Sequence, residues 1–213
     1  PLVTSQEMSM SKTLLQAQDI HKRYRRVQVL RGASLSIGPG EIVGLVGENG
    51  SGKTTFMHIL VGLLRRDSGS VQINCQYAYC PQEPLVFDGL TMKENITYFS
   101  AAYGLPAEEG LARGEALLER LNCRKFEDKP AGLLSGGTRQ KLNLIISLLC
   151  NPALLFLDEP YQGFDYESYL TFWDLAKEMA EAGRSALVVS HMVHDRSNLS
   201  RIYRMQEGRT VHD

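Results

Sequence analysis

The sequence has 213 residues, which is enough for one sizeable core, and its 23 Lys and Arg nearly balance its 24 Asp and Glu, giving a formal net charge of −1. A chain so close to neutral lacks the basic surface that binds nucleic acid or an anionic membrane, so we expect no nucleic-acid partner. No apolar run approaches the length of a membrane span, and we do not expect the chain to cross a bilayer by itself. The four cysteines show no metal-ligand spacing and are interpreted as small buried residues in a reducing compartment.

Short apolar alternations between Leu14 and Ile37 predict antiparallel strands in the N-terminal part of the chain. Gly38-Pro39-Gly40 predicts the turn that follows them. The same segment contains a basic cluster from His21 to Arg26, which is interpreted as a solvated strand edge.

A glycine-rich stretch follows the apolar run Ile42 to Val46, which predicts a buried strand, and precedes an amphipathic helix that begins near Phe56. Between strand and helix, the pattern G-x-x-x-x-G-K-T predicts a P-loop, whose backbone N–H groups surround a phosphate. A merely flexible turn is the alternative, and the flanking strand and helix argue against it. We expect Lys53 to reach the β- and γ-phosphates and Thr54 to bind Mg²⁺. The predicted nucleotide-binding residues here are Gly47, Asn49, Gly50, Ser51, Gly52, Lys53, Thr54 and Thr55.

The rest of the chain alternates between short strand patterns and longer helical ones. The predicted strands are 70–73, 77–80, 153–157 and 185–190, and the predicted helices are 92–103, 108–121, 136–149 and 166–182. The apolar runs 153–157 and 185–190 are typical of strands buried on both faces of a parallel sheet. The alternation between Ile202 and Val211 predicts edge strands.

Two carboxylates stand directly after the buried run 153–157. A strand that ends there would bring Asp158 to a Mg²⁺ ion beside the P-loop. Glu159 could then polarise a water molecule for attack on the γ-phosphate. An acidic strand end without a catalytic role is the alternative.

A second glycine-containing helix start occurs at Leu134-Ser135-Gly136-Gly137. Ser135 is a suitable N-cap, and two glycines would let the backbone approach an anion closely. Taken alone, an ordinary helix cap explains this stretch equally well.

In their order along the chain, these features resemble the ATP-binding cassette (ABC) family over nearly the whole sequence. The segments 47–54, 154–159 and 134–140 are similar to its Walker A, Walker B and signature motifs. Single residues fall at its other motif positions: Gln82 at the Q-loop, Asp165 at the D-loop, His191 at the switch histidine and Tyr24 at the aromatic that stacks on adenine. Thr138 stands where Gln or Glu is usual, and Phe164 where Leu is usual, which affects only the fine geometry of a dimer contact.

The resemblance implies an α/β fold with a P-loop NTPase core, in which a mainly parallel sheet has flanking helices. It also implies an N-terminal antiparallel β subdomain and an inserted α-helical subdomain. On this basis residues 1–213 form a single ABC ATPase domain. Residues 12–85 and 152–213 are assigned to the core with its β subdomain, and residues 86–151 to the helical subdomain.

The resemblance further implies an active ATPase that uses ATP and Mg²⁺. Two cassettes pair head to tail, so that Ser135, Gly136 and Gly137 of one contact the ATP held by the P-loop of the other. The implied catalytic residues are Lys53, Gln82, Glu159 and His191, and the implied metal contacts are Thr54, Gln82 and Asp158. For Tyr24 and His191, an ordinary strand aromatic and a packed core histidine are the alternatives.

For the biological role, the resemblance implies the subunit that powers a membrane transporter, an exporter with separate permease subunits. It would sit on the cytoplasmic face of the membrane, paired with a second ABC ATPase domain in a homodimer or heterodimer. Leu85, Val86, Phe87 and Leu90 are candidates for the permease dock, although core packing explains each at least as well. The alternatives are a soluble ABC ATPase not coupled to transport and a P-loop kinase or GTPase, which lacks an N-K-x-D motif here.

Overall fold

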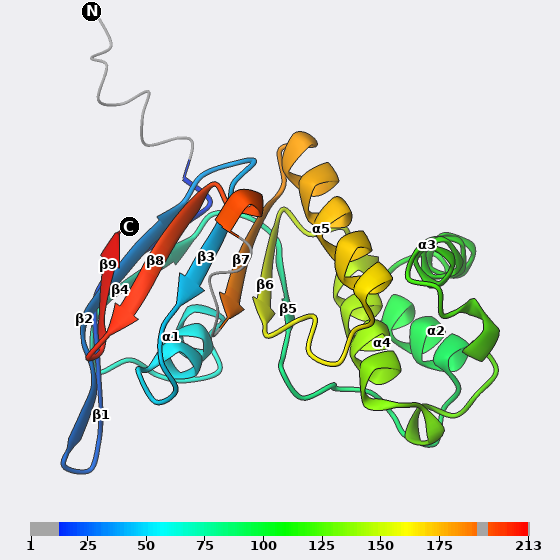
Figure 1. Cartoon of the computed structure of the whole chain (residues 1–213), viewed down its shortest axis with the longest axis horizontal. Coiled ribbons are helices and arrows are strands. Elements are labelled where there is room, and N and C mark those ends of the chain that lie inside the picture. The colour runs from blue at the N-terminus through cyan, green and yellow to red at the C-terminus, as the bar shows by residue number, and fades with distance from the viewer. Residues whose placement is uncertain (1–12, 191–195, 213) are drawn as a thin grey trace, which may run out of the picture.

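The computed structural model describes residues 13–190 and 196–212, and it contains two β-sheets and a helical region (Figure 1). The smaller sheet is three-stranded and antiparallel, in the order β2-β1-β4. Its strands are β1 (Leu15–Tyr24), β2 (Val27–Ile37) and β4 (Ser68–Ile73). The larger sheet has six strands in the order β5-β6-β7-β3-β8-β9. These are β3 (Ile42–Val46), β5 (Tyr77–Cys80), β6 (Leu154–Asp158), β7 (Ser185–Ser190), β8 (Arg201–Gln206) and β9 (Arg209–His212).

The central strands of the larger sheet are buried on both faces, as continuous apolar runs require in a parallel sheet. In β6, Leu154 and Phe156 pack on one side of the sheet, whereas Leu155 and Leu157 pack on the other. The first side faces α1 (Lys53–Leu60) and the antiparallel sheet, and the second faces the remaining helices. The molecule is therefore layered, and α1 lies between the two sheets (Figure 1).

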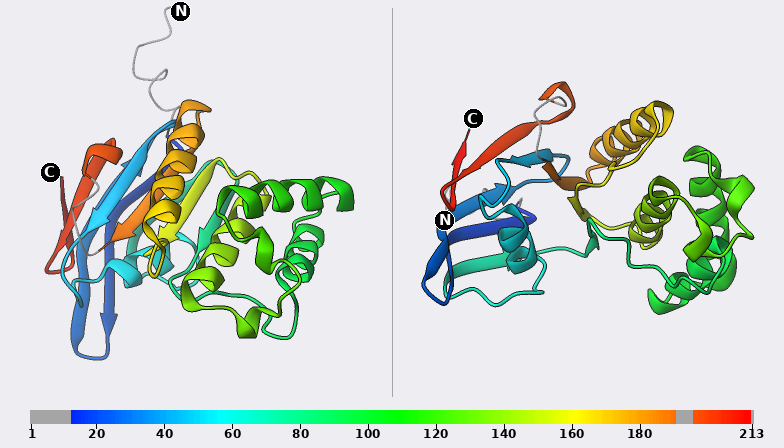
Figure 2. Two further views of the ribbon diagram at one scale, coloured as in Figure 1. Left: turned by 45° about the vertical axis from the view of Figure 1, so that its right-hand side comes forward. Right: turned by 60° about the horizontal axis from the view of Figure 1, so that its bottom comes forward.

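The helical region lies to one side of the sheets, where α2, α3 and α4 cluster together (Figure 2). Its helices are α2 (Met92–Ala102), α3 (Ala107–Arg120) and α4 (Gly136–Leu149), and α5 (Tyr166–Glu181) packs between it and the sheet. Helix α2 begins at a capping box, in which the Thr91 hydroxyl accepts from the backbone N–H of Glu94 and the Glu94 carboxylate accepts from that of Thr91.

This architecture agrees with the predicted fold class, and the bounds of α2 to α5 differ from the predicted ones by at most one residue at either end. Helix α1 begins at Lys53, before the predicted start near Phe56. Of the edge strands predicted between Ile202 and Val211, β9 does lie at the edge of its sheet, whereas β8 lies between β3 and β9. The basic cluster also differs from the prediction, since β1 is the middle strand of its sheet. Arg25, which has a left-handed φ of 51°, stands in the β1–β2 turn.

Two glycines on α3 set how closely it packs on α2. A Cβ at Gly110 would lie 2.4 Å from Ser100 Cβ, and a Cβ at Gly114 would lie 2.4 Å from Ile96 Cγ2. Both partners are buried, so neither can move away without disturbing the core. The helix contact therefore depends on glycine at these two positions.

We predict that Gly114→Ala destabilises the protein. Alanine gains about 0.5–1 kcal/mol of helix propensity over glycine, but overpacking a buried contact costs about 1–3 kcal/mol. The overpacking cost exceeds the gain in helix propensity, because Ile96 is only 1% exposed and cannot move away. Urea unfolding should show a lower midpoint for Gly114→Ala. Gly89→Ala is the control, since a Cβ there meets nothing within 4 Å. Equal midpoints for the two variants would contradict the packing argument.

Candidate nucleotide-binding site

The P-loop connects the end of β3 at Val46 to the start of α1 at Lys53. Gly50 (φ 79°) and Gly52 (φ 108°) have positive φ angles, which are unfavourable for residues other than glycine. A Cβ at Gly47 would lie 2.5 Å from the carbonyl oxygen of Met205, so the loop packs directly against β8. These constraints turn the backbone at the N-terminus of α1 into the kind of concave turn that binds anions.

Lys53 is 5% exposed and lies within this loop. Its ammonium donates hydrogen bonds to the carbonyl oxygens of Gly47 (2.7 Å) and Glu48 (3.0 Å). Burial lowers the pKa of Lys53, and the carboxylates of Glu159 and Asp158 act in the opposite direction. The lysine is thus a cation held between the loop and two acids, where it can pair with a phosphate.

The two acids lie at the end of β6 and line the same cavity as Lys53. Asp158 is 2% exposed, and Glu159 has a left-handed φ of 50° and donates its backbone N–H to the Val189 carbonyl (3.1 Å). The cavity has a volume of about 390 Å³. It is lined by most of the residues that the sequence predicts: Asn49, Gly50, Gly52, Lys53, Thr54, Thr55, Gln82, Asp158 and Glu159.

The three residues predicted to contact a metal, Thr54, Gln82 and Asp158, line this one cavity. Each offers a side-chain oxygen, the donor type that Mg²⁺ prefers. In the described part of the chain no group of three or more His, Cys, Asp or Glu could hold a metal ion. The donor set, one carboxylate, one hydroxyl and one amide oxygen, fits Mg²⁺ that is also held by the phosphates of a nucleotide.

The two glycines that follow Ser135 line a different cavity, although it lies next to the first. This second cavity has a volume of about 290 Å³ and is lined by Gly136, Gly137, Gln82 and Gln162, among others. Gln82 lines both cavities, and its amide group donates to that of Gln162 at 3.4 Å. Within one chain, the signature-like helix start therefore does not face the P-loop cavity.

The start of α4 is fixed by its cap and by a close backbone contact. The Ser135 hydroxyl accepts from the backbone N–H of Thr138 (3.3 Å) and is hydrogen-bonded to the Thr138 hydroxyl (2.8 Å). A Cβ at Gly137 would lie 2.1 Å from the Gly163 carbonyl oxygen. Thr138, one of the two departures from the family pattern, is thus part of the cap, and Gly137 lies directly against the segment before α5.

That segment is tied to α4 by an ion pair. The Lys141 ammonium donates to the Asp165 carboxylate at 2.9 Å, and its side chain is only 8% exposed. Asp165 is also the N-cap of α5, accepting from the backbone N–H of Ser168 (2.9 Å). The hydrogen bond from Lys141, followed by that from Ser168, holds the pKa of Asp165 well below its usual range. Lys141 thereby links the two segments on either side of the second cavity.

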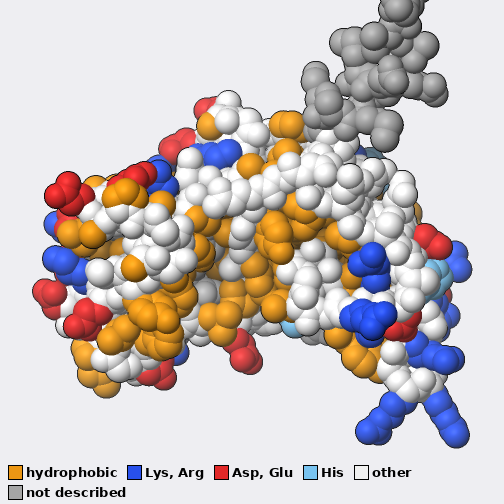
Figure 3. All heavy atoms as spheres, turned by 180° about the vertical axis from the view of Figure 1, so that it is seen from behind, with side chains coloured by type: hydrophobic (Ala, Val, Ile, Leu, Met, Phe, Trp, Pro, Cys, Tyr) orange, Lys and Arg blue, Asp and Glu red, His pale blue; other side chains and the backbone are white. Residues whose placement is uncertain are grey.

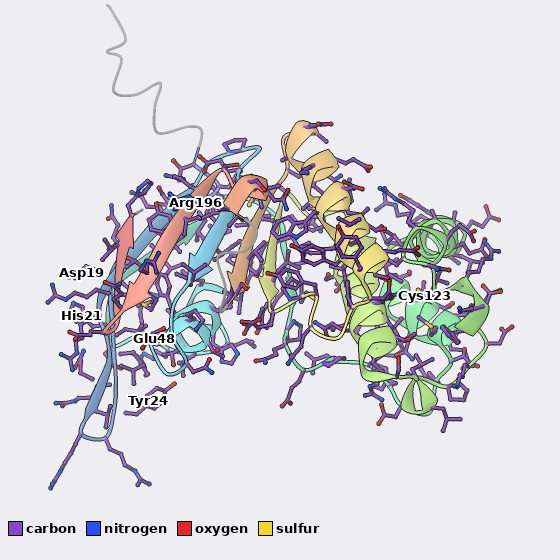
Figure 4. All side chains as sticks on the ribbon, in the orientation of Figure 1. Asp19, His21, Tyr24, Glu48, Cys123 and Arg196 are labelled. Carbon is purple, nitrogen blue, oxygen red and sulfur yellow. The ribbon has the colours of Figure 1, made fainter. Side chains whose placement is uncertain are left out.

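Of the other predicted residues, Gly47 and Ser51 line a separate cavity on the β8 side of the P-loop, and Tyr24 and His191 are not placed in the P-loop cavity either. Tyr24, at the end of β1, is 46% exposed, and the Lys22 ammonium lies 5.7 Å from its ring centroid. Figure 4 shows Tyr24 near the tip of the β1–β2 hairpin, with Glu48 of the P-loop above it. Its role in stacking on adenine stays a prediction. His191 lies outside the described residues, directly after Ser190 at the end of β7.

Sequence reasoning missed some of the residues that line these cavities, among them Val29 and Gln162. Val29 of β2 lies against the P-loop cavity, and Gln162 lines the second cavity beside Gln82. The signal for Gln162 was its position between Glu159 and Asp165, since a short loop between two functional residues must pass close to both. No local pattern marks Val29, because its contact joins separate sheets.

We predict that removing Asp165 from its ion pair with Lys141 destabilises the protein more than removing Lys141 does. Asp165→Asn keeps an N-cap oxygen for α5 but leaves a buried ammonium without its anion. We expect this to lower the free energy of unfolding by about 1–2 kcal/mol. Lys141→Met removes the buried charge and leaves a carboxylate that is 61% exposed, so it should cost less. Urea unfolding at neutral pH measures both, and an equal or larger loss for Lys141→Met would contradict this account.

The same pair fixes the direction of the pH dependence. Because the folded-state pKa of Asp165 is depressed, its stabilising contribution is complete above the unfolded-state pKa and is lost as the pH falls through the folded-state pKa. The stability difference between wild type and Asp165→Asn should therefore begin to shrink only below about pH 4.

Comparison with known proteins places this geometry in a family. The sequence model of the family described as ABC transporter matches residues 30–162. The lipopolysaccharide export system ATP-binding protein LptB of Acidithiobacillus ferridurans is 32% identical, over 93% of this chain and 88% of that protein. The Nod factor export ATP-binding protein I of Burkholderia thailandensis is 31% identical, over 95% of this chain and 71% of that protein.

Solved structures agree. One described as an ATP binding subunit of an ABC transporter superposes with a TM-score of 0.88 at 26% identity, over 94% of this chain and 90% of that one. A dimeric ATP-binding cassette in a post-hydrolysis state with ADP and Pi gives a TM-score of 0.85 at 22% identity, over 93% of this chain and 97% of that one. This second likeness shows the shared fold. The chain therefore belongs to the ABC transporter family of ATP-binding proteins and is an ABC ATPase.

Proposed function

We propose that this chain binds Mg-ATP between two cassettes and uses ATP-driven closure and reopening of that dimer to power an exporter with separate membrane subunits. The observation that carries the proposal is the separation of the P-loop cavity from the signature-like helix start in one chain. Each chain offers two unlike half-sites, and a head-to-tail pair would complete both.

In this proposal different residues of the P-loop cavity bind the phosphates, bind Mg²⁺ and activate the attacking water. Lys53 and the backbone of the P-loop hold the β- and γ-phosphates, while Thr54, Asp158 and Gln82 hold Mg²⁺. When bound, Mg²⁺ would neutralise charge on the phosphate oxygens. Glu159 orients and polarises the attacking water, and His191 supports the γ-phosphate.

The second half-site is the start of α4. Ser135, Gly136 and Gly137 stand at a helix N-terminus, where backbone N–H groups and the helix dipole favour an anion. The ion pair between Lys141 and Asp165 holds this helix start in place before a partner arrives. The partner cassette can be a second copy of this chain or a related one.

The transport role rests on an apolar surface of the helical region. None of the described helices is long and apolar enough to span a membrane. Leu85 (65% exposed), Phe87 (45%) and Tyr98 (51%) are exposed, and the Phe87 and Tyr98 ring centroids lie 4.7 Å apart. Figure 3 shows hydrophobic side chains gathered over the helical region. We assign this surface to the permease contact, on the cytoplasmic face of the membrane.

Of the four residues that the sequence suggests for the permease contact, two are exposed and two are not. Leu85 and Phe87 are exposed, whereas Val86 packs against the core and Leu90 is half-buried. The export direction rests on the relatives named above, both of which are described as parts of export systems.

Glu159→Gln tests the ATPase part of the proposal. Removing the base should slow hydrolysis by about 10²- to 10⁴-fold, because general base catalysis contributes a factor of this size. ATP binding should persist, and the ATP-bound dimer should accumulate. Phosphate release and light scattering with ATP measure the two effects. Glu167→Gln, an exposed glutamate on α5, is the control. Wild-type hydrolysis in Glu159→Gln would remove Glu159 from the role of base.

Affinity capture from solubilised membranes, without ATP, tests the transport part. We expect a multi-span membrane protein to co-purify at near-equal stoichiometry, and Phe87→Asp with Tyr98→Asp should abolish its recovery. Leu63→Asp, at a site that is 66% exposed in another part of the molecule, should leave recovery unchanged. Recovery of the chain only with soluble factors would instead favour an ABC ATPase not coupled to transport.

A further inference from the structure

A further cavity lies between α3, α4 and α5, and none of its lining residues belongs to the two cavities described above. Its volume is about 350 Å³, within the range of roughly 300–1,000 Å³ that ligand sites occupy. One wall is α3 of the helical region, and the facing wall is α5, which packs on the sheet. A ligand here would contact both parts of the protein.

The floor of this cavity is apolar. Leu117 of α3, Leu148 of α4, and Leu175 and Met179 of α5 meet there. Leu175 and Met179 are 7% and 4% exposed, and Leu117 and Leu148 pack on the same hydrophobic core. Such a floor favours a hydrocarbon chain, since covering it removes apolar surface from water.

The rim is made of three arginines, each tied to a neighbouring element. Arg113 donates to the Leu149 carbonyl at the end of α4 (2.7 Å), and Arg120 donates to both carboxylate oxygens of Glu178 (2.8 and 2.7 Å). Arg184 is hydrogen-bonded to the side chain of Asn151. These contacts hold the three guanidinium groups around one opening.

The rim also has unused binding capacity. A guanidinium carries five N–H groups, and in the described part of the chain each of these three uses at most two of them as donors to protein. Arg120 pairs with Glu178 and Arg113 with Glu109 of its own helix, whereas Arg184 has no carboxylate partner in the described part of the chain. The opening therefore carries one excess positive charge, at Arg184, and its remaining guanidinium N–H groups are in a form that matches a carboxylate.

We propose that this cavity binds an amphipathic carboxylate of the medium-chain fatty acid type. Its hydrocarbon chain lies on the floor of Leu117, Leu148 and Met179, and its carboxylate meets the arginine rim. A neutral apolar molecule would leave the excess charge unpaired, and a small polar anion would leave the floor uncovered. The site does not depend on the ATPase or transport roles, because it shares no residue with the nucleotide cavities.

Calorimetric titration of the whole chain with dodecanoate, without nucleotide, tests the proposal. We expect saturable binding of one molecule per chain, and binding of dodecanol about tenfold weaker, because an alcohol cannot pair with the arginines. Arg184→Gln and Arg113→Gln should each weaken dodecanoate binding about tenfold. Lys177→Gln removes the same charge from an exposed position on α5 outside the cavity, and should leave binding unchanged.

Leu117→Trp, which fills the floor, should abolish binding while circular dichroism remains native. If this variant does not fold, the two arginine variants decide the matter by themselves. The proposal fails if wild type shows no saturable binding, if dodecanol binds as tightly as dodecanoate, or if the arginine variants bind like wild type.

Discussion

The parallel pairing of β5, β6, β7 and β3 constrains everything else in this structure. Parallel strands have their carboxyl ends at the same edge of a sheet, and ligands of α/β proteins bind there. Gln82 follows β5, Asp158 ends β6, His191 follows β7 and the P-loop follows β3. Functional residues from four distant segments of the chain lie at one edge of the sheet because these strands are parallel. Of these strands, β3, β6 and β7 are buried on both faces, as the middle of a parallel sheet requires.

Much of this arrangement could be predicted from the sequence, because its signals are local. Helix starts were accurate where a cap marks them, as at Thr91, Ser135 and Asp165. The P-loop and the acids after β6 were found from spacing, and the structure lines one cavity with them. The place of β8 between two strands could not be predicted, because pairing partners far apart in sequence leave no local pattern.

The contacts that sequence reasoning missed are those between segments. The ion pair of Lys141 with Asp165 and the approach of Gly137 to the Gly163 carbonyl join α4 to the loop before α5. The residue types do not predict these contacts; a lysine on a helix, for example, is usually solvated. In the proposed dimer, both contacts preorganise one chain's half of the shared site, so that pairing need not also order this segment.

The place of the helical region in the chain has a consequence for folding. Tyr77 pairs with Leu154 across β5 and β6, so the whole helical region lies within the chain loop that this pairing closes. Closing a loop of flexible chain costs entropy, and distant contacts of this kind form slowly. Collapse of α2, α3 and α4 shortens the span that must be searched. Condensation of these helices therefore lowers the entropy cost of setting the strand that carries Asp158 beside the strand that precedes Gln82.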